Sequence, residues 1–201
     1  MDALSSPTLA VPGNHDITPY NLLERFTDPY ARWRDTIGAE TEPAWFDAEV
    51  AVLGLNTARR FGLSWDWSRG RVTQRRLHRL VERLDAAPKG LARVVVAHHP
   101  LLPPETAPET RVVGGAADAL AALTRSHVVL VLAGHLHRGY ARLVPGEGLR
   151  PLVLQGGTAT SHRLRGEPNA YHRVTVDDGG GVKVELRVWE NGGWTSAATP
   201  R

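Results

Sequence analysis

The sequence predicts an α/β fold, and two repeated patterns carry this prediction. Residues 93–97 and 128–133 are rich in Val and Leu and predict buried strands. Helical patterns precede them at 72–87 and 116–123, with apolar residues three or four positions apart. Strands that alternate with helices are typical of sheets covered by helices. A chain of 201 residues is long enough for one core of this kind, so we expect a single domain over 1–201.

Short strands and helices are expected in the first half of the chain. Its short apolar runs predict strands at 9–11, 45–46 and 49–55. Residues 20–37 have helical spacing, and Pro29 leaves open whether they form one helix or two. Residues 58–71 predict a loop, and Thr73 is the candidate N-cap of the helix that follows.

The last third of the chain predicts strands separated by Gly, Pro and Asp turns. These strands are expected at 140–144, 152–155, 172–176 and 182–188. The last one alternates strictly, with Val182, Val184, Leu186 and Val188 on one face and charged residues on the other. We therefore expect an antiparallel C-terminal sheet with one solvated face.

Composition excludes several classes of protein. The chain is 42% hydrophobic and 22% charged, which excludes a disordered protein. It has no cysteine, so a metal ion would be held by His, Asn, Asp or Glu. No run of 18 apolar residues and no basic-then-apolar leader occurs, so we expect a cytoplasmic protein without a membrane partner. The net charge of +3 is not gathered in a dense basic patch, which argues against nucleic acid as a partner.

Metal-capable side chains follow three of the predicted strands at the same structural position. They are Asn14-His15-Asp16, His98-His99, and His135 with His137. In an open α/β sheet such strand ends can converge in one crevice. The spacing of His135 and His137 would put both imidazoles on the same side of an extended segment. An isolated G-H-x-H motif would favour a surface loop, whereas three motifs at the same position favour a metal site.

In this order, the motifs G-N-H-D, H-H-P and G-H-L-H resemble the last three of five motifs of the calcineurin-like metallophosphoesterases. The segments 156–161 and 169–171 are similar to bacterial members of the cyclic-nucleotide phosphodiesterase type. The resemblance covers most of the chain. It implies two packed mixed β-sheets flanked by helices, with a dinuclear metal centre between the sheets. It also implies that a metal-activated water hydrolyses a small-molecule phosphoester, and a phosphodiester in particular.

The resemblance assigns roles to the motif residues. Asn14, His98 and His135 would bind one divalent ion of the Mn, Fe or Zn class, and His137 would bind a second. A pair of such ions can clamp both oxygens of an in-line displacement.

Two further roles concern the G-N-H-D turn and the H-H-P motif. By resemblance, His15 would stabilise the phosphoryl transition state or protonate the leaving oxygen. Asp16 would orient His15 by accepting its other ring proton. His99 would point away from the metal ions or line the pocket.

The chain departs from the family pattern in its carboxylates. The family begins with D-x-H and G-D motifs, and neither occurs in this sequence. We therefore expect an N-terminally truncated domain that lacks the first βαβα portion of the fold. Sheet edges left uncovered in this way would favour self-association.

The missing carboxylates also affect the charge of the metal centre. Asn14, His98, His135 and His137 are all neutral ligands, whereas two divalent ions would bring four positive charges. We expect one ion at the Asn14 site and a His137 site that is empty or very weak. The alternative is a non-catalytic truncated or degenerate homologue that binds one metal ion weakly or none.

Other polar and aromatic residues are weaker candidates. His162, Arg163 and Arg165 could meet a substrate phosphate, and Trp65 and Trp67 could stack on a base. A surface loop and simple loop packing explain these residues at least as well. Asn56 and Thr57, which end a predicted strand, are interpreted as turn residues.

Overall fold

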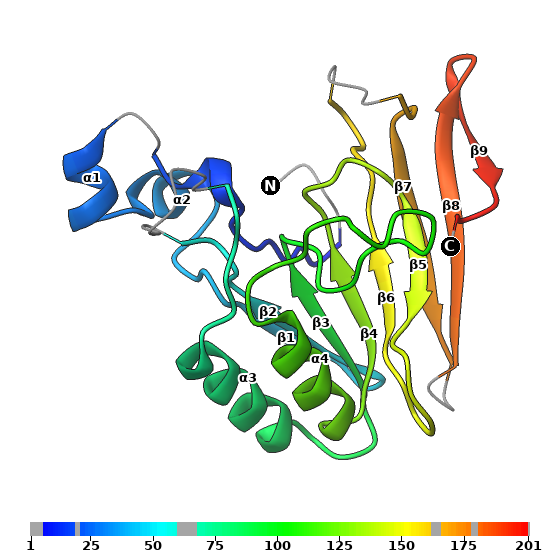
Figure 1. Cartoon of the computed structure of the whole chain (residues 1–201), viewed down its shortest axis with the longest axis horizontal. Helices are drawn as coiled ribbons and strands as arrows, with labels where there is room; N and C mark the ends of the chain where they lie inside the picture. The colour runs from blue at the N-terminus through cyan, green and yellow to red at the C-terminus, as the bar shows by residue number, and fades with distance from the viewer. Residues whose placement is uncertain (1–5, 19–20, 60–67, 162–165, 178–180, 201) are drawn as a thin grey trace.

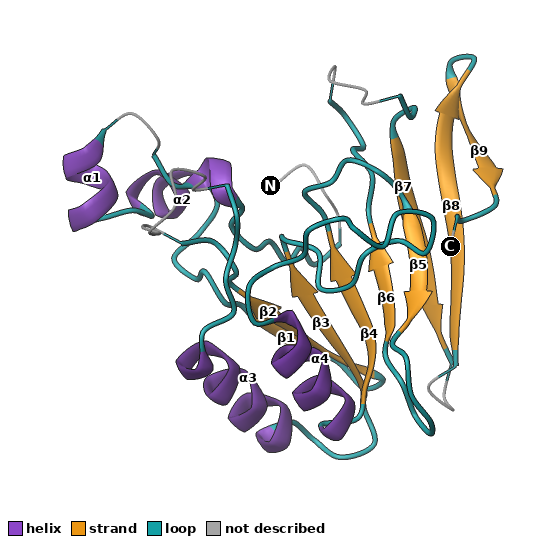
Figure 2. Ribbon diagram, in the orientation of Figure 1, coloured by secondary structure: helices purple, strands orange, loops and turns teal. Residues whose placement is uncertain are grey.

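The strands form a six-stranded mixed sheet and a three-stranded antiparallel sheet (Figures 1 and 2). The computed structural model describes residues 6–18, 21–59, 68–161, 166–177 and 181–200. The larger sheet has the order β1-β2-β3-β4-β6-β5, and the smaller one has the order β7-β8-β9. The predicted α/β class with two sheets and flanking helices is confirmed, although the smaller sheet is antiparallel rather than mixed.

Four parallel strands form the centre of the larger sheet. Its strands are β1 (Ala44–Phe46), β2 (Val50–Leu55), β3 (Ala92–Ala97), β4 (Val128–Ala133), β5 (Tyr140–Leu143) and β6 (Leu152–Gln155). Strands β2, β3, β4 and β6 are parallel, and β1 and β5 add antiparallel edges. Leu55 lies opposite Ala97, and Ala133 lies opposite Gln155. The four parallel strands therefore end at the same edge of the sheet.

Two helices cover one face of the larger sheet, α3 (Gln74–Ala86) and α4 (Ala116–Arg125) (Figure 1). Leu84 of α3 and Leu123 of α4 are fully buried in one cluster with Val95 and Val131 of the sheet. The predicted N-cap is confirmed, since Thr73 Oγ1 accepts a hydrogen bond from Arg76 N at 3.3 Å.

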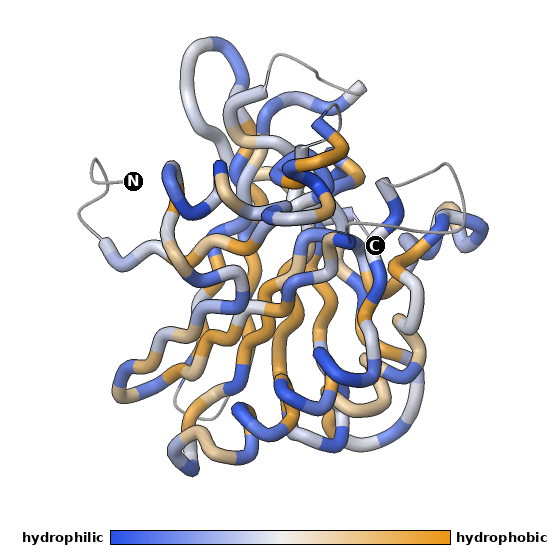
Figure 3. Tube along the Cα trace, turned by 90° about the vertical axis from the view of Figure 1, so that its left-hand side faces the viewer, coloured by the Kyte–Doolittle hydropathy of each residue, from blue (hydrophilic) through white to orange (hydrophobic). Residues whose placement is uncertain are grey.

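The smaller sheet packs against the opposite face of the larger one. It contains β7 (Ala170–Val176), β8 (Val182–Glu190) and β9 (Gly193–Ala197). Val174 and Val184 pack against a cluster formed by three inward residues of the larger sheet, which are Val94, Leu130 and Leu154. Figure 3 shows the hydrophobic segments concentrated along the strands and the hydrophilic ones in the turns. The core therefore lies on both faces of the larger sheet.

One expectation for the C-terminal region is wrong, and one strand was missed. Residues 140–143 and 152–155 were expected in the antiparallel sheet, but they join the larger sheet because β6 pairs in parallel with β4. Strand β9 was not predicted, because its sequence has no clear alternation of apolar and polar residues.

The N-terminal region lies beside the edge where the parallel strands end. It contains a short 3₁₀ helix, η1 (Asn14–Asp16), and two helices, α1 (Leu22–Thr27) and α2 (Ala31–Thr36). The alternative of two helices around Pro29 is therefore confirmed. The strand expected at 9–11 does not form, because β2 and β3 already have both neighbours in the sheet. Val11 instead packs against Gly54 of β2, where a Cβ would lie 2.9 Å from Val11 Cγ1.

None of the described helices is both long and apolar enough to span a bilayer.

We predict that His172 of β7 makes the stability of the fold depend on pH. Burial lowers the pKa of His172 to about 4, whereas an unfolded histidine has a pKa of 6.5. The unfolded chain therefore takes up this proton first, so stability is complete above pH 6.5 and falls as the pH approaches 4. Between pH 7 and pH 5, His172→Gln should lose about 1–2 kcal/mol less free energy of unfolding than the wild type.

Urea unfolding in EDTA at the two pH values measures this difference. His78→Gln, on the exposed face of α3, is the control and should behave as the wild type does. An equal loss of stability in His172→Gln and the wild type would contradict the prediction.

Candidate metal centre

Three polar side chains meet beyond the carboxyl ends of β3 and β4. Asn14 lies on η1, His98 directly follows β3, and His135 lies in the turn after β4. His98 Nε2 lies 3.1 Å from Asn14 Oδ1 and 3.2 Å from His135 Nδ1. His135 Nδ1 lies 3.1 Å from Asn14 Oδ1. The three atoms form a nearly equilateral triangle, which brings together the residues expected to share one metal ion.

No placement of protons satisfies all three edges of this triangle. Asn14 Oδ1 only accepts, and each ring nitrogen either donates or accepts. If both nitrogens carry protons, two donors face each other. If one or neither carries a proton, two acceptors face each other along at least one edge. A cation shared by the three lone pairs removes the conflict, and ligand atoms about 2.1 Å from an ion lie about 3.0–3.4 Å apart.

The donor set is neutral. Burial, followed by the positive charge of His99, His135, His15 and His137 when protonated, lowers the pKa of His98 to about 3. The lone pair of His98 is therefore available at neutral pH. Two imidazoles and an amide oxygen suit an ion of the Mn, Fe or Zn class better than Mg²⁺ or Ca²⁺.

Gly13 makes room for the His98 ring and also anchors the turn that carries Asn14. A Cβ at Gly13 would lie 2.7 Å from Cε1 of His98 and 2.8 Å from both ring nitrogens. Gly13 N donates to Asp16 Oδ2 at 2.7 Å, and Asp16 N donates to Gly13 O at 3.3 Å. Asp16 Oδ2 therefore holds the backbone of the turn, and the hydrogen bond expected from His15 to Asp16 stays a prediction. His15 is exposed on η1, directly beside Asn14.

The G-H-L-H segment is a strained turn rather than the extended segment that its spacing suggested. His135 and His137 have φ angles of +77° and +59°, in the left-handed region that favours glycine. Gly134 N donates to His98 O at 2.9 Å, and the buried Gln155 side chain donates to Gly134 O. His135 joins the triangle. His137 Nδ1 is buried and has no hydrogen-bond partner among the described residues, so a second ion would satisfy an atom that is now orphaned.

His99 lies close to the triangle but its ring nitrogens are already engaged. Thr57 Oγ1 donates to His99 Nδ1 at 2.8 Å, and His99 Nε2 donates to Ser68 O at 2.8 Å. Nitrogens of His98, His99 and His135 lie within 4.8 Å of one another, but the lone pair of His99 is used by Thr57. Burial lowers the pKa of His99 to about 4. His99 lines the neighbouring pocket, as expected.

Two supporting residues were not found from the sequence. Thr57 was interpreted as a turn residue, and Gln155 as the end of an apolar strand. Both are buried polar residues near the carboxyl end of a parallel strand. The signal available in the sequence was a polar residue at the end of an apolar run. The candidates outside the described residues are His162, Arg163, Arg165, Trp65 and Trp67.

We predict that Gly13→Ala weakens metal binding, because its Cβ would displace the His98 ring. The affinity for Mn²⁺ or Zn²⁺ should fall about 10–100-fold, the loss seen when the support of a ligand is removed. Competition with a chromophoric chelator measures the affinity. Gly157→Ala is the matched control, since its Cβ would meet nothing closer than Ala170 Cβ at 3.7 Å. Equal affinities of the two variants would contradict the prediction.

Comparison with known proteins bears on the same part of the chain. No curated protein sequence matches the chain. The family model described as calcineurin-like phosphoesterase matches residues 1–139, which is more than half of the chain and includes all three motifs. The chain belongs to the calcineurin-like phosphoesterase family.

Proposed function

We propose that this chain hydrolyses a phosphodiester of small-molecule size, with a divalent ion bound by Asn14, His98 and His135. Membership of the family indicates metal-dependent hydrolysis of a phosphoester. The observation that carries the proposal is the triangle of Asn14 Oδ1, His98 Nε2 and His135 Nδ1, whose edges are 3.1–3.2 Å. Three atoms at these separations are at the distances expected of ligands that share one ion, which supports the proposal.

The proposed roles of the residues are of two kinds, binding the ion and transferring a proton. A bound divalent ion polarises a phosphoryl oxygen and lowers the pKa of water. Asn14, His98 and His135 hold the ion through neutral atoms, so they do not cancel its charge. His15 is exposed at the rim of the site, where it can protonate the leaving oxygen. Asp16 fixes the turn on which His15 and Asn14 lie.

A second ion would have His137 as a ligand. No carboxylate belongs to the triangle, so a second divalent ion would add charge without an offsetting anion. We propose one tightly bound ion per chain. The same neutral donor set favours one alternative, a non-catalytic homologue that binds its ion weakly.

We predict that the Mn²⁺-loaded protein hydrolyses bis-p-nitrophenyl phosphate and that EDTA abolishes this activity. His98→Ala should lower kcat/KM by more than about 100-fold, because it removes a corner of the triangle. His78→Ala, exposed on α3, is the control and should keep the wild-type value. Release of p-nitrophenol measures the rate, and metal analysis of the dialysed protein gives the stoichiometry.

The results separate the two candidate functions. Hydrolysis that depends on His98, with one ion per chain, supports the enzyme. A protein that binds an ion but hydrolyses neither this diester nor p-nitrophenyl phosphate is the non-catalytic homologue, and the proposed function fails.

We predict that His15→Gln lowers kcat without weakening metal binding, because His15 lies beside the triangle and not in it. The expected loss is about 100-fold or more, as for removal of a general acid. The loss should be smaller for an ester with a better leaving group, whose oxygen needs less protonation. A parallel fall in metal affinity, measured by chelator competition, would show that His15 acts as a ligand instead.

A further inference from the structure

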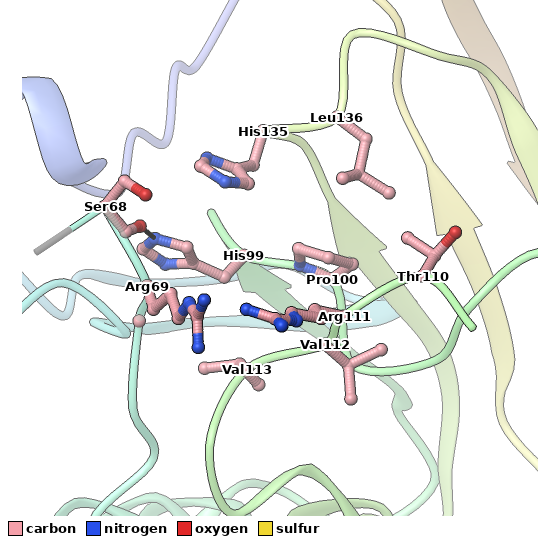
Figure 4. Close-up of a pocket in the computed structure, with 11 residues that line it drawn as sticks. Ser68, Arg69, His99, Pro100, Thr110, Arg111, Val112, Val113, His135 and Leu136 are labelled. Carbon is pink, nitrogen blue, oxygen red and sulfur yellow. Dashed lines mark hydrogen bonds between the residues drawn. The ribbon is translucent and has the colours of Figure 1, made fainter. Parts of the chain in front are cut away.

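A pocket of ≈ 250 Å³ opens beside the triangle and shares His135 with it (Figure 4). His99 and Pro100, which follow β3, form one wall, and Leu136 lies at the other side. Because His135 belongs to both the triangle and the pocket, a substrate held at the metal centre would reach into the pocket. Its lining would therefore contact the part of the substrate next to the scissile phosphate.

Two guanidinium groups dominate the charge of this pocket. Arg69 and Arg111 both line it, and Figure 4 shows their guanidinium groups on the same side, below His99. The described lining residues include no Asp or Glu. Two cations that line one pocket raise its potential and attract anions. The hydroxyl groups of Ser68 and Thr110 add hydrogen-bonding capacity to the same lining.

Backbone hydrogen bonds hold the two arginine-bearing segments together, although they are far apart in sequence. Gly114 N donates to Gly70 O at 3.2 Å, and Val72 N donates to Gly114 O at 2.8 Å. Arg71 N donates to Thr57 O at 2.8 Å, which ties the first segment to the end of β2. The arrangement of Arg69 and Arg111 is thus built into the fold.

His99 connects this pocket to the metal centre. Its ring donates to Ser68 O, directly before Arg69, and a Cβ at Gly70 would overlap the same ring. His98, the neighbour of His99, is a corner of the triangle. The adjacent histidines therefore link the backbone segment that carries Arg69 to the triangle.

We propose that Arg69 and Arg111 bind a second phosphate group of the substrate, next to the scissile ester. Guanidinium groups match phosphate oxygens through paired hydrogen bonds and keep their charge at every physiological pH. The proposal rests on the proposed hydrolytic function and narrows its substrates to phosphoesters that carry a second phosphate.

The first test measures anion binding without catalysis. Metal-free protein in EDTA is titrated with inorganic pyrophosphate by calorimetry. The wild type should bind one anion per chain, and the double variant Arg69→Gln/Arg111→Gln should bind at least 10-fold more weakly. Arg75→Gln, an exposed arginine of α3 outside the pocket, is the matched control and should bind as the wild type does. Equal weakening by Arg75→Gln, or none by the double variant, overturns the proposal.

The second test measures substrate preference in the Mn²⁺-loaded protein. The substrates are thymidine 5′-(p-nitrophenyl phosphate) and the same ester with a 3′-phosphate. The wild type should prefer the 3′-phosphorylated ester at least 10-fold in kcat/KM. The double variant should lose that preference, and Arg75→Gln should keep it. A wild type with equal kcat/KM for both esters overturns the assignment of substrate class. A wild type that hydrolyses neither ester refutes the proposed function, and the calorimetry still decides whether the pocket binds anions.

Discussion

The candidate site depends on the parallel pairing of β3 with β4. Val96 lies opposite Leu132, so both strands end at the same level, and Gly134 N donates to His98 O two residues beyond this last pair. This backbone hydrogen bond fixes the separation of the segments that carry His98 and His135. The register cannot slip by one residue, because Val94 and Val95 belong to cores on opposite faces of the sheet. Hydrophobic burial on both faces of the larger sheet thereby helps to fix the distance between His98 Nε2 and His135 Nδ1.

Burial sets the charge of the site as well as its geometry. His98 and His99 are neutral at physiological pH because burial lowers the pKa of each well below 6.5. Neutral ligands leave the charge of a bound cation undiminished, and Arg69 and Arg111 add two more positive charges nearby. Such a site favours substrates with several negative charges. The neutral ligands and the arginine-lined pocket therefore point to the same kind of substrate.

The sequence predicted the elements that have a local pattern of apolar residues. It did not predict the features that depend on which strands pair with each other. Helices α3 and α4 follow from their periodicity and strands β3 and β4 from their apolar runs, and their residues fill the main core. Residues 152–155 form an apolar run that suits a parallel or an antiparallel neighbour equally well, so their place beside β4 could not be read from it. Residues 9–11 have the composition of a strand but lie outside both sheets, and Val11 packs against Gly54 of β2 instead.

The candidate site shows the same division. Asn14, His98 and His135 could be predicted to converge because each lies in a motif after an apolar run, in the order that a known family uses. Arg69 and Arg111 could not, since hydrogen bonds between distant loops bring them together and no local pattern marks them. The hydrogen-bond partner of Asp16 was also beyond the sequence, because a carboxylate can equally serve a neighbouring ring or the backbone of its own turn.

The turn after β4 carries two costs that a turn built for stability alone would avoid. His135 and His137 both adopt a left-handed backbone, at about 1–2 kcal/mol for each residue that is not glycine. His137 Nδ1 is buried without a partner among the described residues, which adds a desolvation penalty of about 1–3 kcal/mol. Glycine at these two positions would remove the strain, and an exposed side chain would remove the penalty. The left-handed backbone accompanies a His135 ring that faces Asn14 and His98. His137, whose Nδ1 has no partner among the described residues, follows His135 by two positions. An ion at the triangle would offset the strain at His135, whereas only a second ion would offset the penalty at His137 Nδ1.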